Sequence, residues 1–153
     1  SQMHGIFPYI STKGGEAGLF RPQIEFIENT APFCIGTVKV EAVRVSHGFP
    51  CCGYIFSEGG ARLGYISDCH EIGDAEISRL HGVDIMVLNC LRVREHPTHL
   101  SLKRSLEYIG RIAPKKAYLV HMCHDFSHVE WLDMLKGTSV EPAYDGLELV
   151  VGG

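Results

Sequence analysis

The sequence lacks any long apolar run, and no stretch approaches the roughly 18 to 20 residues that a membrane-spanning helix requires. Its N-terminus, Ser-Gln-Met-His-Gly, does not follow the charged and then apolar pattern of a signal peptide. The 14 basic residues are scattered and are outnumbered by 18 acidic ones, so no basic stripe is available for a nucleic-acid backbone. We therefore expect a cytoplasmic protein with neither a membrane nor a nucleic-acid partner.

Cysteine is too sparse for a disulfide scaffold, because the 153 residues hold six cysteines and no Cys-x-x-Cys pair. Reduced thiols are the expectation. Neither proline, with 7 residues, nor charge, at 21%, reaches the level of a disordered chain. The length fits one domain of about 150 residues with a single core.

Hydrophobic periodicity divides the chain into strands first and an alternation of strands and helices later. Residues 1–21 show no period and are expected to form a loop-rich lead-in. Short alternating runs predict strands, with a hairpin turn at Gly59-Gly60, and the nearly continuous apolar run over 83–88 predicts a strand covered on both faces. Spaced apolar residues predict helices, with Asp74 as the cap of the first and a Ser127–Glu130 capping box opening the last. The expected strands are 24–26, 38–45, 54–57, 62–67, 83–88, 117–120, one near 140 and 147–151, and the expected helices are 74–80, 101–113 and 127–135. This order predicts an α/β protein of layered α+β type.

Three candidate metal ligands each follow a predicted strand. His47 follows the strand ending at Ser46, Asp68 follows the one ending at Ser67, and His121 follows 117–120. Strand ends are where sites are built in α/β proteins, and imidazole and carboxylate suit zinc, manganese or iron. Each residue alone also fits a solvated loop position, but their shared placement favours a metal site.

Several ordered segments resemble a known family over essentially the whole chain. The chain is similar to the C-terminal part of metallo-β-lactamase-fold hydrolases, and the nearest branch contains the phosphoribosyl cyclic phosphate phosphodiesterases. The resemblance rests on His47, Gly53-Tyr54, Tyr65-Ile66-Ser67-Asp68, Val87-Leu88-Asn89-Cys90-Leu91-Arg92, Thr98-His99-Leu100-Ser101-Leu102, Ala117 to Asp125 and Tyr144-Asp145-Gly146.

That resemblance implies a four-layer αββα sandwich with two divalent metal ions, zinc or manganese, at the strand ends. In it His47 binds the first ion, Asp68 bridges the two, and His121 binds the second. His99 lies just outside the metal shell and faces the phosphate as an acid or hydrogen-bond donor, with His124 as a further catalytic candidate. A metal-bound hydroxide then attacks the phosphorus of a small phosphate ester or cyclic phosphate.

The family's His-x-His-x-Asp-His motif, which supplies the other ligands, appears nowhere in the chain. We therefore expect residues 1–153 to form a single incomplete domain, the C-terminal portion of the fold. Its exposed sheet face would be covered by the N-terminal half of the same fold or by a homodimer partner. Alone, the chain is expected to bind metal weakly and to hydrolyse little.

Two alternatives belong to other classes. A non-catalytic half-domain would serve only for protein association and would have no need of convergent His47, Asp68, His99 and His121. A structural zinc domain would need Cys51, Cys69 or Cys123 around one ion, and the cysteine spacing matches no finger pattern.

Overall fold

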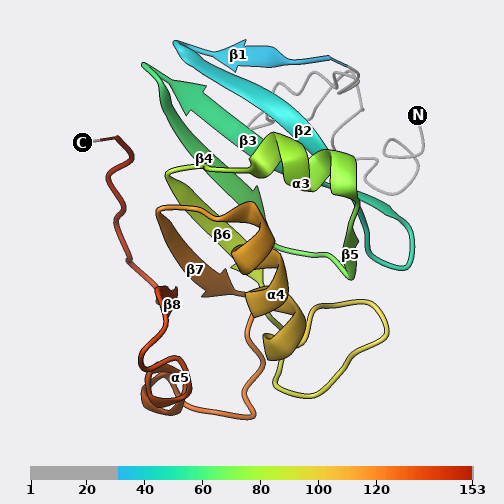
Figure 1. Ribbon diagram of the computed structural model, residues 1–153, viewed down its shortest axis with the longest axis vertical. Helices are drawn as coiled ribbons and strands as arrows, with labels where there is room; N and C mark the ends of the chain where they lie inside the picture. The colour runs from blue at the N-terminus through green and yellow to red at the C-terminus, as the bar shows by residue number, and fades with distance from the viewer. Residues whose placement is uncertain (1–30, 153) are drawn as a thin grey trace, which may run out of the picture. The chain divides into compact units, whose positions relative to one another are not determined.

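The computed structural model describes residues 31–152, which form one mixed β-sheet with helices packed against it (Figure 1). The α/β class is thus confirmed. The expected lead-in over 1–21 and the expected strand at 24–26 lie outside the described residues. The strands are β1 (Phe33–Ile35), β2 (Val38–Ser46), β3 (Pro50–Glu58), β4 (Ala61–Ile66), β5 (Glu71–Ile72), β6 (Ile85–Asn89), β7 (Lys116–Val120) and β8 (Val140–Pro142).

The sheet has two halves that meet at β4. Strands β1, β2, β3 and β4 pair antiparallel in sequence order, with β5 added beside β2, whereas β4, β6, β7 and β8 pair parallel. The predicted hairpin is present, and its turn residues Gly59 and Gly60 have φ of +57° and +89°, a combination that glycine adopts without strain. Strand β2 runs in the same direction as β4, β6 and β7, because two antiparallel pairings separate β2 from β4.

The three helices of the described residues are α3 (Asp74–Leu80), α4 (Leu102–Ile112) and α5 (His128–Met134). The predicted capping box of α5 is confirmed: Ser127 Oγ accepts the Glu130 N–H, and the Glu130 carboxylate accepts the Ser127 N–H. The expectation of an Asp74 cap is wrong. Gly73 occupies the N-cap position, and Asp74 is the first helical residue. There its negative charge still stabilises the helix by interacting with the positive end of the helix dipole.

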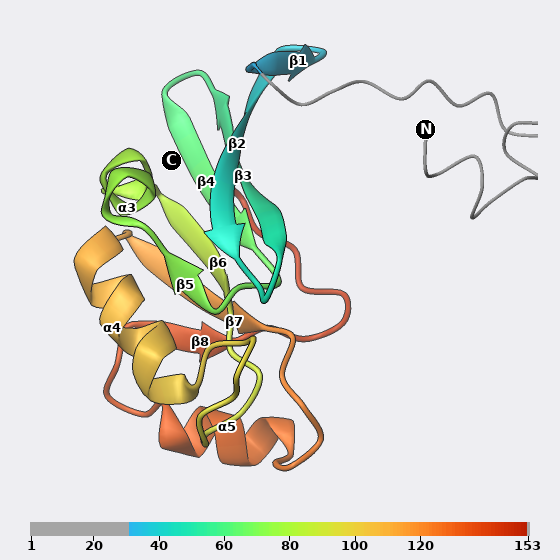
Figure 2. The same ribbon diagram turned by 90° about the vertical axis from the view of Figure 1, so that its right-hand side faces the viewer.

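The main core lies between one face of the sheet and helices α3 and α4, which Figure 2 shows on the same side of the sheet. Every residue of β6 is buried, as its continuous apolar sequence predicts for a strand covered on both faces. Helix residues of this core include Leu80, Ile109 and Ile112, and β6 contributes Met86 and Leu88.

The predicted strand over 147–151 is wrong, because these residues are extended but pair with no strand among residues 31–152. Leu147, Leu149 and Val151 instead pack on Ile85, Val87 and Tyr118, on the sheet face opposite α3 and α4 (Figure 2). Alternating apolar residues can therefore cover a sheet without joining it. No helix within residues 31–152 is both long and apolar enough to cross a membrane.

Candidate metal centre

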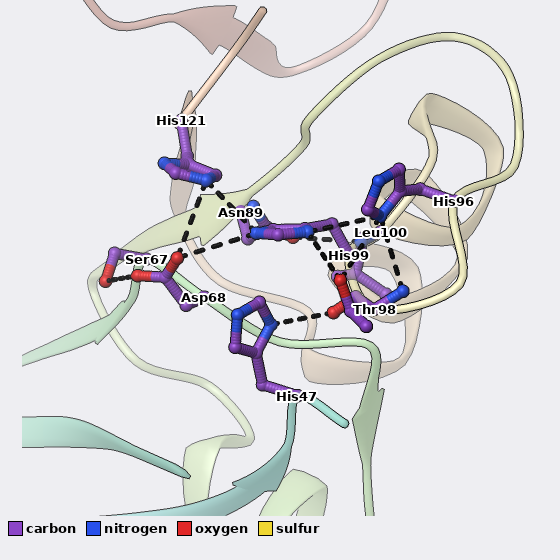
Figure 3. A network of polar contacts seen from close by, with 9 residues as sticks. All are labelled: His47, Ser67, Asp68, Asn89, His96, Thr98, His99, Leu100 and His121. Carbon is purple, nitrogen blue, oxygen red and sulfur yellow. Dashed lines mark hydrogen bonds and ion pairs between the residues drawn. The ribbon is translucent and has the colours of Figure 1, made fainter. Parts of the chain in front are cut away.

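Four candidate side chains meet where β2, β4, β6 and β7 end (Figure 3). Donor atoms of His47, Asp68 and His99 all lie within 4.8 Å of one another. His121 Nε2 lies 3.1 Å from His99 Nε2 and 3.5 Å from Asp68 Oδ1. The structure therefore brings the sequence-predicted ligands His47, Asp68 and His121 to one edge of the sheet, with His99 among them.

His47 is oriented by the backbone of the loop between β6 and α4. Its Nδ1 lies 2.8 Å from the carbonyl oxygen of Thr98, which can only accept a hydrogen bond. Nδ1 therefore carries the proton, and Nε2 of the neutral ring keeps its lone pair. This is the arrangement in which histidines bind metals, with the second nitrogen tied to a carbonyl or carboxylate.

Asp68 is held as a carboxylate. The Ser67 hydroxyl donates to Asp68 Oδ2 at 2.7 Å and lowers the pKa of the carboxyl, and the neighbouring His121, His47 and His99 lower it further. Partial burial opposes this shift without reversing it. Asp68 Oδ1 faces the imidazoles, 3.6 Å from His99 Nε2, and can bridge two cations through one carboxylate.

His121 has a backbone conformation that its sequence does not reveal. Its φ is +61°, in the left-handed region that residues with a Cβ seldom occupy. The turn after β7 is fixed because the Cys123 N–H donates to the Leu91 carbonyl at 2.8 Å. Strained non-glycine residues cluster at functional sites, and here the strained residue carries a ring whose Nε2 lies 3.5 Å from Asp68 Oδ1.

His99 is carried by a loop that is tied to the core. Asn89, fully buried at the end of β6, accepts the Leu100 N–H at its side-chain oxygen, and its carbonyl accepts the Ser105 hydroxyl. These contacts hold His99, the residue before Leu100, over the sheet edge. The side chain of His99 is only 14% exposed, and burial, then the neighbouring His47, lowers its pKa.

Sequence reasoning overlooked two residues of the site, His96 and Thr98. His96 Nδ1 lies 3.2 Å from His99 Nδ1, and Thr98 contacts His47, His96 and His99. The signal that could have found them is the i, i+3 spacing of His96 and His99 in His-Pro-Thr-His. The catalytic candidate His124 is exposed, and no hydrogen bond or ion pair joins it to the site within residues 31–152.

The donors suit a divalent cation. Within the described residues, the set of potential ligands that converge consists of imidazoles and a carboxylate, with no cysteine among them. Such ligands fit zinc, manganese or iron, and they do not fit the thiolate set that a structural zinc domain would require. Cys69, beside Asp68, is buried, and burial raises the pKa of its thiol to about 12.

Comparison with known proteins agrees with this geometry. The model of the beta-lactamase superfamily domain matches residues 4–122. The chain belongs to the beta-lactamase superfamily. Over 123 residues it is 32% identical to the octanoyltransferase of Porphyromonas gingivalis, a match that covers 78% of this chain and 24% of that protein. The chain thus spans about a quarter of this curated relative.

Solved structures place this superfamily member in the metallo-β-lactamase fold. A diphosphatase from the PhnP family is similar with a TM-score of 0.77 and 27% identity, over 97% of this chain and 55% of that one. The metallo-β-lactamase fold protein YhfI from Bacillus subtilis shares the fold, with a TM-score of 0.66 and 15% identity over 79% of this chain and 53% of that one. The chain spans about half the length of both structures.

Proposed function

We propose that this chain is part of a metal-dependent hydrolase that cleaves a small phosphodiester or cyclic phosphate. The observation that carries the proposal is the convergence of His47, Asp68, His99 and His121 at one sheet edge, with donor atoms 3.1 to 3.6 Å apart around Asp68 and His99. The likeness to a diphosphatase of the PhnP family supports phosphate chemistry. An association module without catalysis has no use for such convergence.

The chain's own residues have clear tasks in that reaction. His47, Asp68 and His121 would hold two divalent ions, zinc or manganese, which supply an activated hydroxide and neutralise charge on the phosphate oxygens. Asp68, whose pKa is lowered by Ser67, stays anionic at neutral pH and balances the cations. Thr98 fixes the ring of His47 with its lone pair toward Asp68.

We further propose that the remaining ligands come from the N-terminal half of the same fold. This chain spans 55% of the diphosphatase it resembles, and one bridging carboxylate with one histidine for each ion leaves both ions short of the four ligands that zinc takes. Six free cysteines, two of them buried, suit the reducing cytoplasm, where we place the protein.

The test measures hydrolysis of bis(4-nitrophenyl) phosphate and of a diphosphate ester with Zn²⁺ or Mn²⁺. It compares the 153-residue chain, the chain co-expressed with an N-terminal half that carries His-x-His-x-Asp-His, and the Asp68→Asn variant of that pair. We expect turnover in the pair, little in the chain alone, and loss of turnover in the variant.

Asp145→Asn provides a matched control, since Asp145 is an exposed carboxylate outside the four-residue cluster. It should retain turnover. A pair that binds metal but hydrolyses neither substrate contradicts the proposed reaction. A chain that is fully active as a homodimer contradicts only the proposed partner.

A further inference from the structure

The last described segment of the chain, residues 147–151, arranges its side chains as a β-strand does. Alternate residues, Leu147, Leu149 and Val151, are partly buried against the sheet, whereas Val150 between them is 90% exposed. This is the two-residue period of an extended strand with one covered face. In a β-sandwich, the strands of one sheet pack on the other sheet in this way.

The backbone of this segment carries hydrogen-bonding groups that the described residues do not use. The Leu147 N–H donates to the Tyr144 carbonyl at 3.1 Å, and beyond it no hydrogen bond within residues 31–152 involves the backbone of residues 148–151. An extended chain directs its N–H and C=O groups sideways, toward the place of a neighbouring strand. A row of such unpaired groups is a template for a further strand.

The sheet face beside this segment is apolar and only partly covered. Phe56 of β3 lies opposite Leu63 of β4, and both half-buried side chains are on the face away from α3 and α4, because the adjacent Ile55 belongs to the core on the helical side. Phe56, Leu63 and Val38 line a hollow with Val151 of the segment. A strand placed next to the segment would therefore cover apolar surface here.

A second hollow beside the segment is charged. It lies where β6 and β7 begin, and it is lined by Asp84, Ile85, Lys115, Lys116, Val150 and Gly152. Lys115 Nζ lies 2.7 Å from Asp84 Oδ1. An apolar strand placed here would remove charged groups from water, which is costly, so the side of Phe56 and Leu63 is favoured.

We propose that residues 147–151 are a strand of a second sheet whose other strands belong to the N-terminal half of the fold. This half docks by pairing one of its strands with the backbone of the segment and by packing apolar side chains on Phe56 and Leu63. In strand addition of this kind, main-chain hydrogen bonds give affinity and alternate side chains give specificity. The inference rests on the proposed function for the companion half, and it adds where that half binds.

The size of the similar diphosphatase leaves room for such a partner. This chain covers 55% of that protein, so nearly half of it has no counterpart here and is available to supply the strands. The segment is also in place before the partner arrives, because a Cβ on Gly152 would lie only 2.8 Å from Ala61 Cβ at the start of β4. A strand that is already ordered reduces the entropy cost of association.

The test follows amide hydrogen exchange by NMR in the 153-residue chain alone and in its complex with the co-expressed N-terminal half. In the chain alone, the amides of residues 148–151 should exchange rapidly, as in an open strand edge. In the complex, exchange at alternate residues should slow by at least about tenfold, because a strand donates to one neighbour from every second residue.

Proline substitutions separate backbone pairing from side-chain packing. Leu149→Pro and Val150→Pro each remove one N–H, and the two N–H groups lie on opposite edges of the segment. Leu149→Ala and Val150→Ala are the matched controls, since they shorten the same side chains but keep the N–H. At the pairing edge, proline should weaken association with the N-terminal half about tenfold relative to alanine, as measured by isothermal titration calorimetry. Urea midpoints equal to those of the alanine controls show that the variants are folded.

The inference is overturned if residues 148–151 are protected in the monomeric chain alone, if the N-terminal half does not bind or leaves them unprotected, or if neither proline variant binds that half more weakly than its alanine control. Protection that appears only as the chain self-associates would make a second copy the occupant and would also overturn it.

The two proposals fail separately. A complex that hydrolyses phosphodiesters while residues 148–151 exchange freely would contradict this inference and leave the proposed function standing. A complex that protects these residues and binds metal but hydrolyses no phosphodiester would support this inference and contradict that function.

Discussion

Gly53 in β3 is expected to tolerate no side chain. A Cβ built on Gly53 would lie 2.4 Å from Ile66 Cγ1 and 2.7 Å from the carbonyl oxygen of Tyr65. Ordinary contact begins near 3.4 Å, so β3 and β4 would have to separate by about 1 Å at a position where Ile66 is fully buried. Overpacking of this kind typically costs about 1–3 kcal/mol.

For Gly53→Ala we therefore expect a loss of about 2 kcal/mol in the free energy of unfolding. That corresponds to about 4–8 °C in Tm for a domain of this size and to about 1 M in the urea midpoint. Circular dichroism during urea and thermal unfolding measures both. Because Ile66 directly precedes Ser67 and Asp68, the variant should also bind Zn²⁺ more weakly.

The same substitution at Gly110 is the matched control. Gly110 lies in the last turn of α4 and is exposed, and no atom would lie within 4 Å of a Cβ built on it. Alanine is the better helix former, so Gly110→Ala should stabilise the protein by about 0.5–1 kcal/mol. If Gly53→Ala matched the wild type within about 0.5 kcal/mol, the close packing of β3 on β4 would be refuted.

Two further predictions concern titrating groups. Asp84 accepts from Lys115 Nζ and from the Arg62 N–H, each at 2.7 Å, and these contacts, Lys115 first, lower its pKa. A lowered folded-state pKa stabilises the protein above the ordinary value of 3.8 and loses that effect as the pH falls through the folded-state pKa. Asp84→Asn should thus lower the urea midpoint at pH 7, and its difference from the wild type should shrink as the pH falls below 3.8. A difference that stays constant with pH would exclude this linkage. Burial raises the pKa of Cys69 and of Cys90 to about 12, so iodoacetamide at pH 8 should label the exposed Cys52 first and those two only after unfolding, as peptide mass spectrometry can show; equal labelling rates would contradict their burial.

Local rules predicted the parts of the fold that are decided locally. The capping box at Ser127 and the Gly59-Gly60 turn are set by residues within four positions of each other, and both are confirmed. The continuous apolar sequence of β6 likewise indicated a strand covered on both faces. Residues 147–151 misled because the same alternation suits a paired strand and an extended segment that only packs, and pairing depends on partners distant in the chain.

Only the site residues that directly follow a strand could be predicted from the sequence. His47, Asp68 and His121 were found because each follows a recognisable strand, and parallel strands end at a common edge. The left-handed backbone of His121 has no local signal, since nothing in its side chain favours φ of +61°. The contacts of His96 arise from a loop whose course is fixed by a hydrogen bond from the Leu100 N–H to the fully buried side chain of Asn89, and no residue pattern within the loop indicates that contact.

Thr98 contacts three imidazoles through three different groups: its carbonyl faces His47, its amide N–H faces His96, and its hydroxyl lies 3.0 Å from His99 Nδ1. Two of these contacts come from main-chain atoms that every residue except proline possesses. Serine, valine or alanine at position 98 would therefore leave most of the ring alignment in place, whereas proline would remove the amide hydrogen. The orientation of His47 and His96 thus depends on backbone atoms of residue 98, and it can persist when the side chain at this position changes.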